Sequence, residues 1–176
     1  EGKGPKPEVT GGGRRLYTVE DLASLRALLD DGAKGGRRYL PHRRPGEHLQ
    51  VTCVVNFKGG SGKTTTTAHL AQHLALHGYR TLAIDLDPQA SLSALHGYQP
   101  EFDVGENQTL YGAIRYDDQK RPISEIIQQT YFPNLDLIPG NIELMEYEHD
   151  TPKALADNPG QGLFFTRLDS ALSEVQ

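Results

Sequence analysis

The feature that most constrains the fold is a glycine-rich turn at residues 58–65, Lys-Gly-Gly-Ser-Gly-Lys-Thr-Thr. It follows the β-branched, apolar run Val51–Phe57, which is typical of a strand buried on both faces. It precedes a segment with helical apolar spacing, residues 63–77, and then a second strand-like run, Thr81–Leu86. Together these elements have the length of one strand–helix–strand unit, which needs a right-handed crossover and a parallel sheet. The sequence therefore predicts an α/β fold with a doubly wound parallel sheet.

The residue types of this turn suit a bound triphosphate. Backbone N–H groups that converge at a helix N-terminus hold negative charge, and glycines let the main chain approach phosphate oxygens. Lys63 is placed to reach the β- and γ-phosphates, and the Thr64 hydroxyl to complete the shell of a Mg²⁺ ion. The alternative is a turn that binds nothing. The predicted residues for ATP or ADP are Gly59, Gly60, Ser61, Gly62, Lys63, Thr64 and Thr65.

Two carboxylates follow the second strand, in the stretch Ile84-Asp-Leu-Asp-Pro-Gln89. Parallel sheets place ligands at the carboxyl ends of their strands, so Asp85 and Asp87 are expected to face the phosphates. One of them can hold a metal-bound water while the other orients the attacking water. The alternative is that these side chains only cap the helix that follows.

The turn departs from the standard Gly-x₄-Gly-Lys-Thr pattern, because Phe57 stands where the first glycine is expected and Lys58 precedes Gly59-Gly60. It resembles the deviant Walker A motif of the ParA/MinD class of P-loop ATPases, in which the extra lysine reaches across a nucleotide-sandwiched dimer. The resemblance implies a catalytic role for Lys58, since a second cation offsets charge on the transferring phosphoryl group. It also implies that Asp87 positions the attacking water, and Asp85 is assigned with Thr64 to the metal.

The resemblance covers most of residues 49–172 and is strongest to the RepA proteins of repABC-type plasmids, which are ParA-like partition ATPases. The stretches that carry it are residues 68–101, 102–118, 137–144 and 146–150. It implies a DNA segregation ATPase that forms a homodimer on ATP, binds DNA and hydrolyses ATP when a ParB-like centromere-binding partner stimulates it. It further implies repression of its own operon and a cytoplasmic, nucleoid-associated location without a membrane partner.

Two other functions stay open. One is a nucleotide-regulated transcriptional repressor in which hydrolysis is incidental. The other is a MinD-like membrane-cycling ATPase, which needs a terminal amphipathic helix. No apolar strand that ends in Asp follows Ile138. We therefore expect residues 49–176 to be the first part of the ATPase domain, truncated before the Walker B strand, the second switch and the adenine-contacting loops.

Residues 1–48 are predicted to be a separate basic segment. The chain has a net charge of −5, yet residues 1–50 hold ten Lys and Arg against seven Asp and Glu. Thr18, Asp21 and the leucine spacing that follows predict a short helix ended by Gly32. Residues 15–26 resemble the start-of-helix pattern of a winged or MerR-like helix-turn-helix unit, so that residues 1–48 would be the end of such a DNA-binding unit, and the alternative is a solvated basic linker with one amphipathic helix. If it reads DNA, its arginines mostly contact phosphates. They are Arg14, Arg15, Arg26, Arg37, Arg38, Arg43 and Arg44.

The remaining patterns complete the expected fold. Helices are predicted at residues 109–114, 123–130 and 163–172, and a strand at residues 135–138. The single cysteine, Cys53, excludes an internal disulfide and is expected in the core. Histidines 69, 73 and 77 are expected on a solvated helix face rather than in a zinc site.

Overall fold

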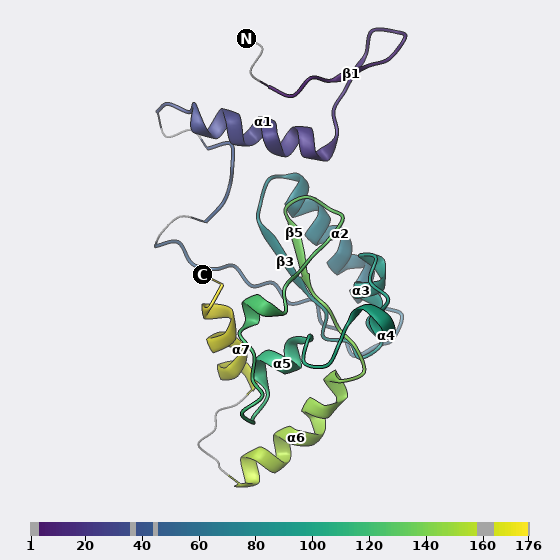
Figure 1. The fold of residues 1–176 in the computed structure, drawn as a ribbon, viewed down its shortest axis with the longest axis vertical. Coiled ribbons are helices and arrows are strands. Elements are labelled where there is room, and N and C mark those ends of the chain that lie inside the picture. Colours follow the sequence, from purple (N-terminus) through teal and green to yellow (C-terminus); the bar gives the residue numbers. More distant parts are fainter. Residues whose placement is uncertain (1–3, 36–37, 44–45, 158–163, 176) are drawn as a thin grey trace.

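A three-stranded sheet between helices forms the centre of the molecule (Figure 1). The structure is a computed structural model that describes residues 4–35, 38–43, 46–157 and 164–175. Strand β3 (Thr81–Ile84) pairs in parallel with β5 (Leu135–Ile138), in a register that places Thr81 beside Leu135 and Ile84 beside Ile138. Strand β4 (Gln128–Gln129) pairs antiparallel with the other side of β5. The sheet is therefore mixed rather than wholly parallel.

Helices cover both faces of this sheet, because the strands alternate their side chains between two apolar cores. On one face, helix α2 (Lys63–Leu76) packs its alanines against β3 and β5. That core contains Ala68, Ala71, Ala75, Ala83, Leu92, Leu135 and Leu137. On the other face, Ile138 packs with helices α5 (Leu110–Ile114) and α7 (Phe164–Ser173). The predicted α/β class, with helices on both sides of the sheet, is confirmed.

Four further helices complete this part of the fold within the described residues. Three are short, namely α3 (Ser91–Leu95), α4 (Pro100–Asp103) and the 3₁₀ helix η1 (Ile123–Glu125), and the fourth is the longer α6 (Leu144–Asp157). The helix predicted over residues 123–130 is wrong. Only one 3₁₀ turn forms, with Ile123 and Ile126 buried, and the chain then extends so that Gln128 and Gln129 can pair with β5. The expected helices at 109–114 and 163–172 are confirmed within the described residues.

The strand predicted over Val51–Phe57 is also wrong. The segment has no regular secondary structure, and Val51, Val55 and Phe57 are exposed. A strand needs a hydrogen-bonded neighbour, and within the described ranges none pairs with this segment, since β3 pairs with β5 instead. The predicted strand–helix–strand unit therefore lacks its first strand and does not form. Cys53 is exposed rather than in the core for the same reason.

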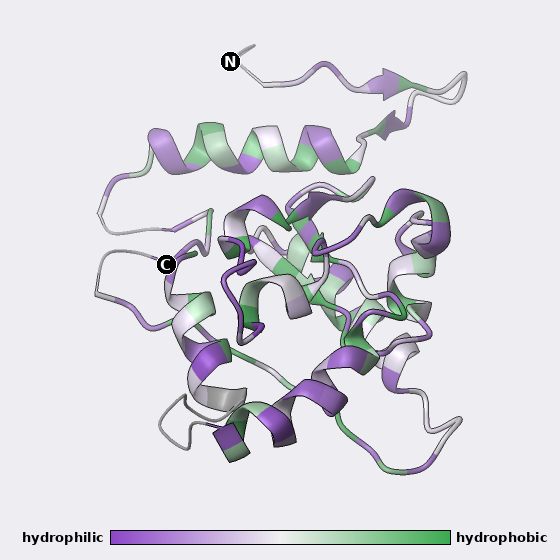
Figure 2. Cartoon of the chain, turned by 60° about the horizontal axis from the view of Figure 1, so that its bottom comes forward, coloured by the Kyte–Doolittle hydropathy of each residue, from purple (hydrophilic) through white to green (hydrophobic). Residues whose placement is uncertain are grey.

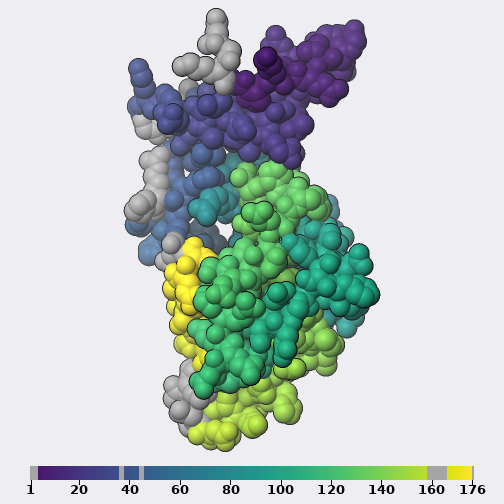
Figure 3. All heavy atoms as spheres, in the orientation of Figure 1, coloured from purple at the N-terminus to yellow at the C-terminus, as the bar shows by residue number. Residues whose placement is uncertain are grey.

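The N-terminal residues form a hairpin and a helix at one end of the molecule (Figures 1 and 3). Strands β1 (Glu8–Val9) and β2 (Arg15–Leu16) pair antiparallel, and neither strand was predicted from the sequence. Helix α1 (Val19–Asp31) begins with the predicted capping box between Thr18 and Asp21, and ends at Gly32. It has no buried residue, and apolar side chains alternate with polar ones along it (Figure 2).

One arginine joins α1 to the part of the protein that contains the sheet β3–β5–β4. The Arg26 guanidinium donates to the Leu76 carbonyl at the end of α2. Its side chain lies so close to Gly78 that a Cβ at that glycine would be 3.1 Å from Arg26 Cδ. Gly78 also has a φ of 90°, a conformation that glycine adopts without strain. The turn after α2 therefore supports both the β3 strand and the N-terminal helix.

We predict that Tyr111→Phe lowers the free energy of unfolding by about 1 kcal/mol at neutral pH. The Tyr111 hydroxyl donates to Asp150 Oδ2 at 2.6 Å, which joins α5 to α6 and holds the pKa of Asp150 below its ordinary value. Because that pKa is lowered on folding, the stabilisation is fully present above the ordinary carboxyl pKa and is lost as the pH falls below it, through the lowered pKa of the folded protein. Urea unfolding between pH 3 and pH 8 measures this, with Tyr79→Phe on the surface as the control. A difference that does not shrink in acid contradicts the assignment.

Candidate nucleotide-binding site

The glycine-rich turn has the backbone geometry of an open cradle. Gly60 and Gly62 have φ angles of 69° and 82°, in the left-handed region that L-residues adopt only with strain. A Cβ built at Gly59 or Gly60 would meet no atom within 4 Å. The turn is therefore shaped by glycine conformation and leaves the space beside its main chain empty.

Helix α2 begins at this turn without a side-chain cap. Its N-cap is Gly62, and no side chain accepts a hydrogen bond from the first N–H groups of the helix. Uncapped N–H groups at a helix N-terminus attract anions. In the part of the chain that the structure describes, the ammonium groups of Lys58 and Lys63 have no hydrogen-bond or ion-pair partner either. These residues fit a phosphate chain, with the half-buried Thr64 hydroxyl beside it for Mg²⁺.

The start of helix α2 and the end of strand β3 lie at the same end of the sheet (Figure 1). Helix α2 packs on β3, and the short turn 77–80 connects the two. The helix and the strand therefore run in opposite directions. The start of α2 consequently lies near the end of β3, which Asp85 follows directly. Helix α3, just after Asp87, also contacts α2. That Asp85 and Asp87 face phosphates held by this turn stays a prediction, and the strand expected before the turn does not form.

Asp85 and Asp87 have different surroundings. Asp85 is only 3% exposed, and its carboxylate accepts hydrogen bonds from the Asp87 N–H (3.1 Å), the Ser93 N–H (2.9 Å) and the Ser93 hydroxyl (2.7 Å). Asp87 is exposed, and its Oδ1 accepts from the Gln89 N–H at 3.0 Å. Asp87 is thus the carboxylate open to solvent, whereas Asp85 is held within the protein. The assignment of Asp85 to a metal ion stays a prediction.

Sequence reasoning missed Ser93 and Gly140. Ser93 lies eight residues beyond Asp85, and Gly140 is brought to it only by the pairing of β3 with β5. No local motif signals either residue. The dipeptide Pro139-Gly140 is typical of a strand end, and it indicates only where β5 stops.

The arginines predicted to contact DNA are not equivalent. Arg14 and Arg15 are exposed on the hairpin. Arg26 donates to Leu76, and Arg38 pairs with Glu47 at 3.0 Å. Arg43 is exposed and lies 3.4 Å from the Glu47 carbonyl oxygen. Arg37 and Arg44 lie outside the described residues.

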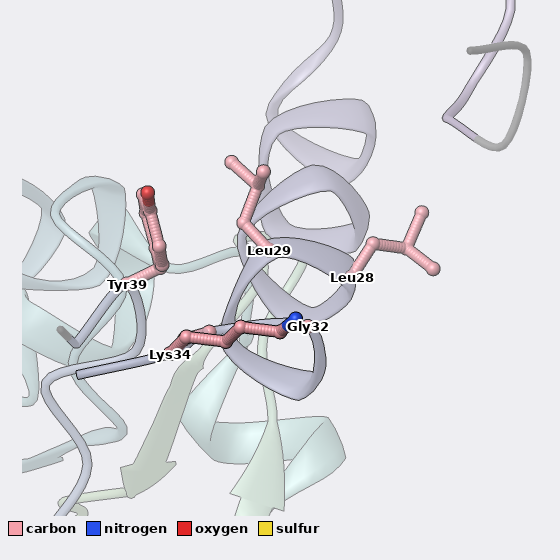
Figure 4. Close-up of a pocket in the computed structure, with 6 residues that line it drawn as sticks. Leu28, Leu29, Gly32, Lys34 and Tyr39 are labelled. Carbon is pink, nitrogen blue, oxygen red and sulfur yellow. The ribbon is translucent and has the colours of Figure 1, made fainter. Parts of the chain in front are cut away.

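Other candidate features lie elsewhere. A hollow of about 340 Å³ beside α1 is lined by Leu28, Leu29, Gly32, Ala33, Lys34 and Tyr39 (Figure 4).

The three histidines of helix α2 and its end, residues 69, 73 and 77, are exposed, and His73 and His77 have ring centroids 4.2 Å apart. Among the described residues, no three His, Cys, Asp or Glu side chains gather as a metal site. No helix within those same ranges has the length and apolar character needed to cross a bilayer.

The fold and the turn together define an α/β protein of the P-loop NTPase type. A solved structure of cobyrinic acid a,c-diamide synthase from Mycobacterium smegmatis, with a bound ATP analogue and magnesium, matches it with a TM-score of 0.57 and 28% identity. That match covers 69% of this chain and 44% of the other. The AAA domain family model matches residues 49–175.

The chain belongs to this AAA domain family and is ParA-like, as the turn predicted. It is 61% identical over 165 residues to a candidate replication protein A of Rhizobium rhizogenes. It is 37% identical over 95 residues to the chromosome partitioning protein ParA of Myxococcus xanthus. These matches cover 93% and 54% of this chain, but only 41% and 31% of the two relatives. The chain thus spans less than half the length of these curated relatives.

We predict that Gly62→Ala destabilises the nucleotide-free protein by about 1–2 kcal/mol, because alanine at a φ of 82° is strained. Gly59→Ala is the matched control, since Gly59 lies in the same turn with open space around it and no positive φ. Its effect is expected to stay within about 0.5 kcal/mol. Urea unfolding without nucleotide makes the comparison, and equal losses in the two variants would contradict the left-handed geometry of Gly62.

Proposed function

We propose that this chain is part of an ATPase that segregates plasmid DNA. It binds ATP or ADP with Mg²⁺ at residues 58–65, forms a homodimer on ATP, binds DNA, and hydrolyses ATP when a ParB-like partner stimulates it. The proposal includes repression of its own operon and a cytoplasmic, nucleoid-associated location. The observation that carries it is the uncapped start of α2 behind left-handed Gly60 and Gly62, at the same sheet edge as the exposed Asp87.

In this proposal each part of the site has one task. The N–H groups at the start of α2 and the Lys63 ammonium hold the phosphates. A Mg²⁺ ion beside Thr64 supplies charge neutralisation when bound. Asp87 accepts a hydrogen bond from the attacking water and orients it. Lys58, whose ammonium group has no partner in the described protein, is free to neutralise phosphoryl charge in the opposite subunit.

The comparisons support the nucleotide part of the proposal most directly. The solved structure with bound ATP analogue and magnesium shares this fold over 69% of the chain. The partition part is supported by the relative named as a chromosome partitioning protein, and by the stronger likeness to the candidate replication protein. DNA contact is supported by the exposed arginines of the N-terminal hairpin.

A second function, a transcriptional repressor that uses nucleotide as a conformational ligand, is favoured by one observation. Arg14 and Arg15 are exposed at a hairpin that precedes helix α1, a compact arrangement of basic and helical elements. In this case ATP would set which conformation is populated, and hydrolysis would not be required.

We predict that the full-length protein binds random DNA with ATP, but not with ADP or without nucleotide. A complex that makes six to ten phosphate contacts is expected to weaken by about 10³–10⁵ between 50 and 200 mM salt. Lys58→Ala should abolish the ATP-dependent binding, while Lys120→Ala on the surface should not. Fluorescence anisotropy at two salt concentrations measures both. Equal binding with and without ATP would reject the DNA-coating mechanism and favour the repressor.

We also predict that Asp87→Ala lowers kcat about a hundredfold or more with little change in the Kd for ATP, because water orientation is lost while the phosphate cradle remains. Glu101→Ala, another exposed carboxylate variant, is the control. In cells, Asp87→Ala should block plasmid segregation if hydrolysis drives the cycle. Normal segregation by a hydrolysis-deficient Asp87→Ala protein would show that hydrolysis is incidental.

A further inference from the structure

We infer that Ser93 is a positioning residue for hydrolysis: it links Asp85 at the end of β3 to the Gly140 amide after β5, and so fixes the backbone from which Asp87 projects. This inference rests on the proposed function, in which Asp87 orients the attacking water. It adds two residues, Ser93 and Gly140, that the sequence motifs do not contain.

The Ser93 hydroxyl uses both of its hydrogen-bonding capacities in this link. It donates to Asp85 Oδ2 at 2.7 Å and accepts from the Gly140 N–H at 2.9 Å. Ser93 is fully buried, so water does not compete for either bond. A buried hydroxyl that bridges a carboxylate and a main-chain amide is expensive to disrupt, because both partners lose a hydrogen bond where no solvent replaces it.

Asp85 carries this link to the backbone of Asp87. Its Oδ1 accepts from the Asp87 N–H at 3.1 Å, while its Oδ2 accepts from both the N–H and the hydroxyl of Ser93. The Asp85 N–H in turn donates to the Ile138 carbonyl at 3.0 Å, which continues the β3–β5 ladder. Asp85 therefore ties the loop after β3 both to the sheet and to helix α3.

Gly140 closes the arrangement from the other strand. A Cβ at this position would lie 2.9 Å from the Asp87 carbonyl oxygen and 3.1 Å from Asp85 Cγ. The backbone after β5 thus touches the backbone of Asp87 directly, and only glycine leaves room for it. The Asp87 side chain, by contrast, is exposed beyond these contacts. The link holds the base of the loop and leaves its carboxylate free for a water molecule.

The test is the variant Ser93→Ala in the full-length protein, which removes one oxygen and adds no volume. We expect kcat for ATP hydrolysis to fall by about ten- to a hundredfold, as a small displacement of a catalytic group does. The Kd for ATP should stay within about twofold, because the cradle at residues 58–65 is not part of the link. Ser91→Ala, an exposed serine of the same helix, is the matched control and should change neither constant.

A second readout does not depend on activity. Amide hydrogen exchange of the nucleotide-free protein should rise by about tenfold at Gly140 and Asp87 in Ser93→Ala, and stay unchanged in α2 and β5. Gly140→Ala is the second variant. It keeps every hydrogen-bonding group yet pushes on the Asp87 carbonyl, so it should lower kcat in the same way without weakening ATP binding.

The outcomes separate the inference from its premise. Faster amide hydrogen exchange at Gly140 and Asp87, together with a loss of kcat at an unchanged Kd for ATP, supports the inference that Ser93 positions Asp87. Faster local exchange with kcat within about twofold of wild type overturns it, as does an equal loss of kcat and ATP affinity in both variants. If wild-type protein binds ATP but Asp87→Ala hydrolyses it normally, the proposed role of Asp87 fails. Unchanged exchange at Gly140 in Ser93→Ala would show instead that the link itself is absent.

Discussion

The parallel pairing of β3 with β5 is the contact on which the candidate site depends. It places the ends of two strands that are 54 residues apart in sequence, Ile84 and Ile138, side by side. The loops that leave these ends therefore meet, and Asp85 can hydrogen-bond to Ser93 while Ser93 bonds to Gly140. Helix α2 packs on the same two strands, so the glycine-rich turn at its start is held near that edge.

This geometry gives two carboxylates, two residues apart, different tasks. Asp85 is buried and accepts three hydrogen bonds from donors of its own loop and helix, which fixes the main chain. Asp87 stays exposed on that fixed main chain. The glycine-rich turn differs from this loop, since its shape depends on glycine conformations rather than on buried side chains, and the helix N–H groups behind it are uncapped. The fixed loop that carries the carboxylate and the open turn are thus supplied by different parts of the chain.

Several elements were predictable because their cause is local. The capping box at Thr18, the alanine face of α2 and the Pro139-Gly140 end of β5 each depend on residues within one turn or strand. The candidate site residues at 58–65, 85 and 87 were predicted for a similar reason, as motifs with a chemical meaning, and their roles stay predictions. The failures were non-local. Val51–Asn56 has strand-forming residues but no partner in the described chain, and Gln128 and Gln129 form a strand rather than part of a helix because they pair with β5.

By itself, the sequence determined the class of fold, the glycine-rich turn before α2 and the carboxylates that follow β3, because glycine conformation and strand-end residues are local features of the chain. Tertiary structure alone decided which strand pairs with which, and with that the roles of Ser93 and Gly140. Their meeting requires a hydrogen-bonded register between segments far apart in the chain. The apolar patterns of these strands are too alike to specify that register, which is set by how α2, α5 and α7 cover the two faces of one sheet.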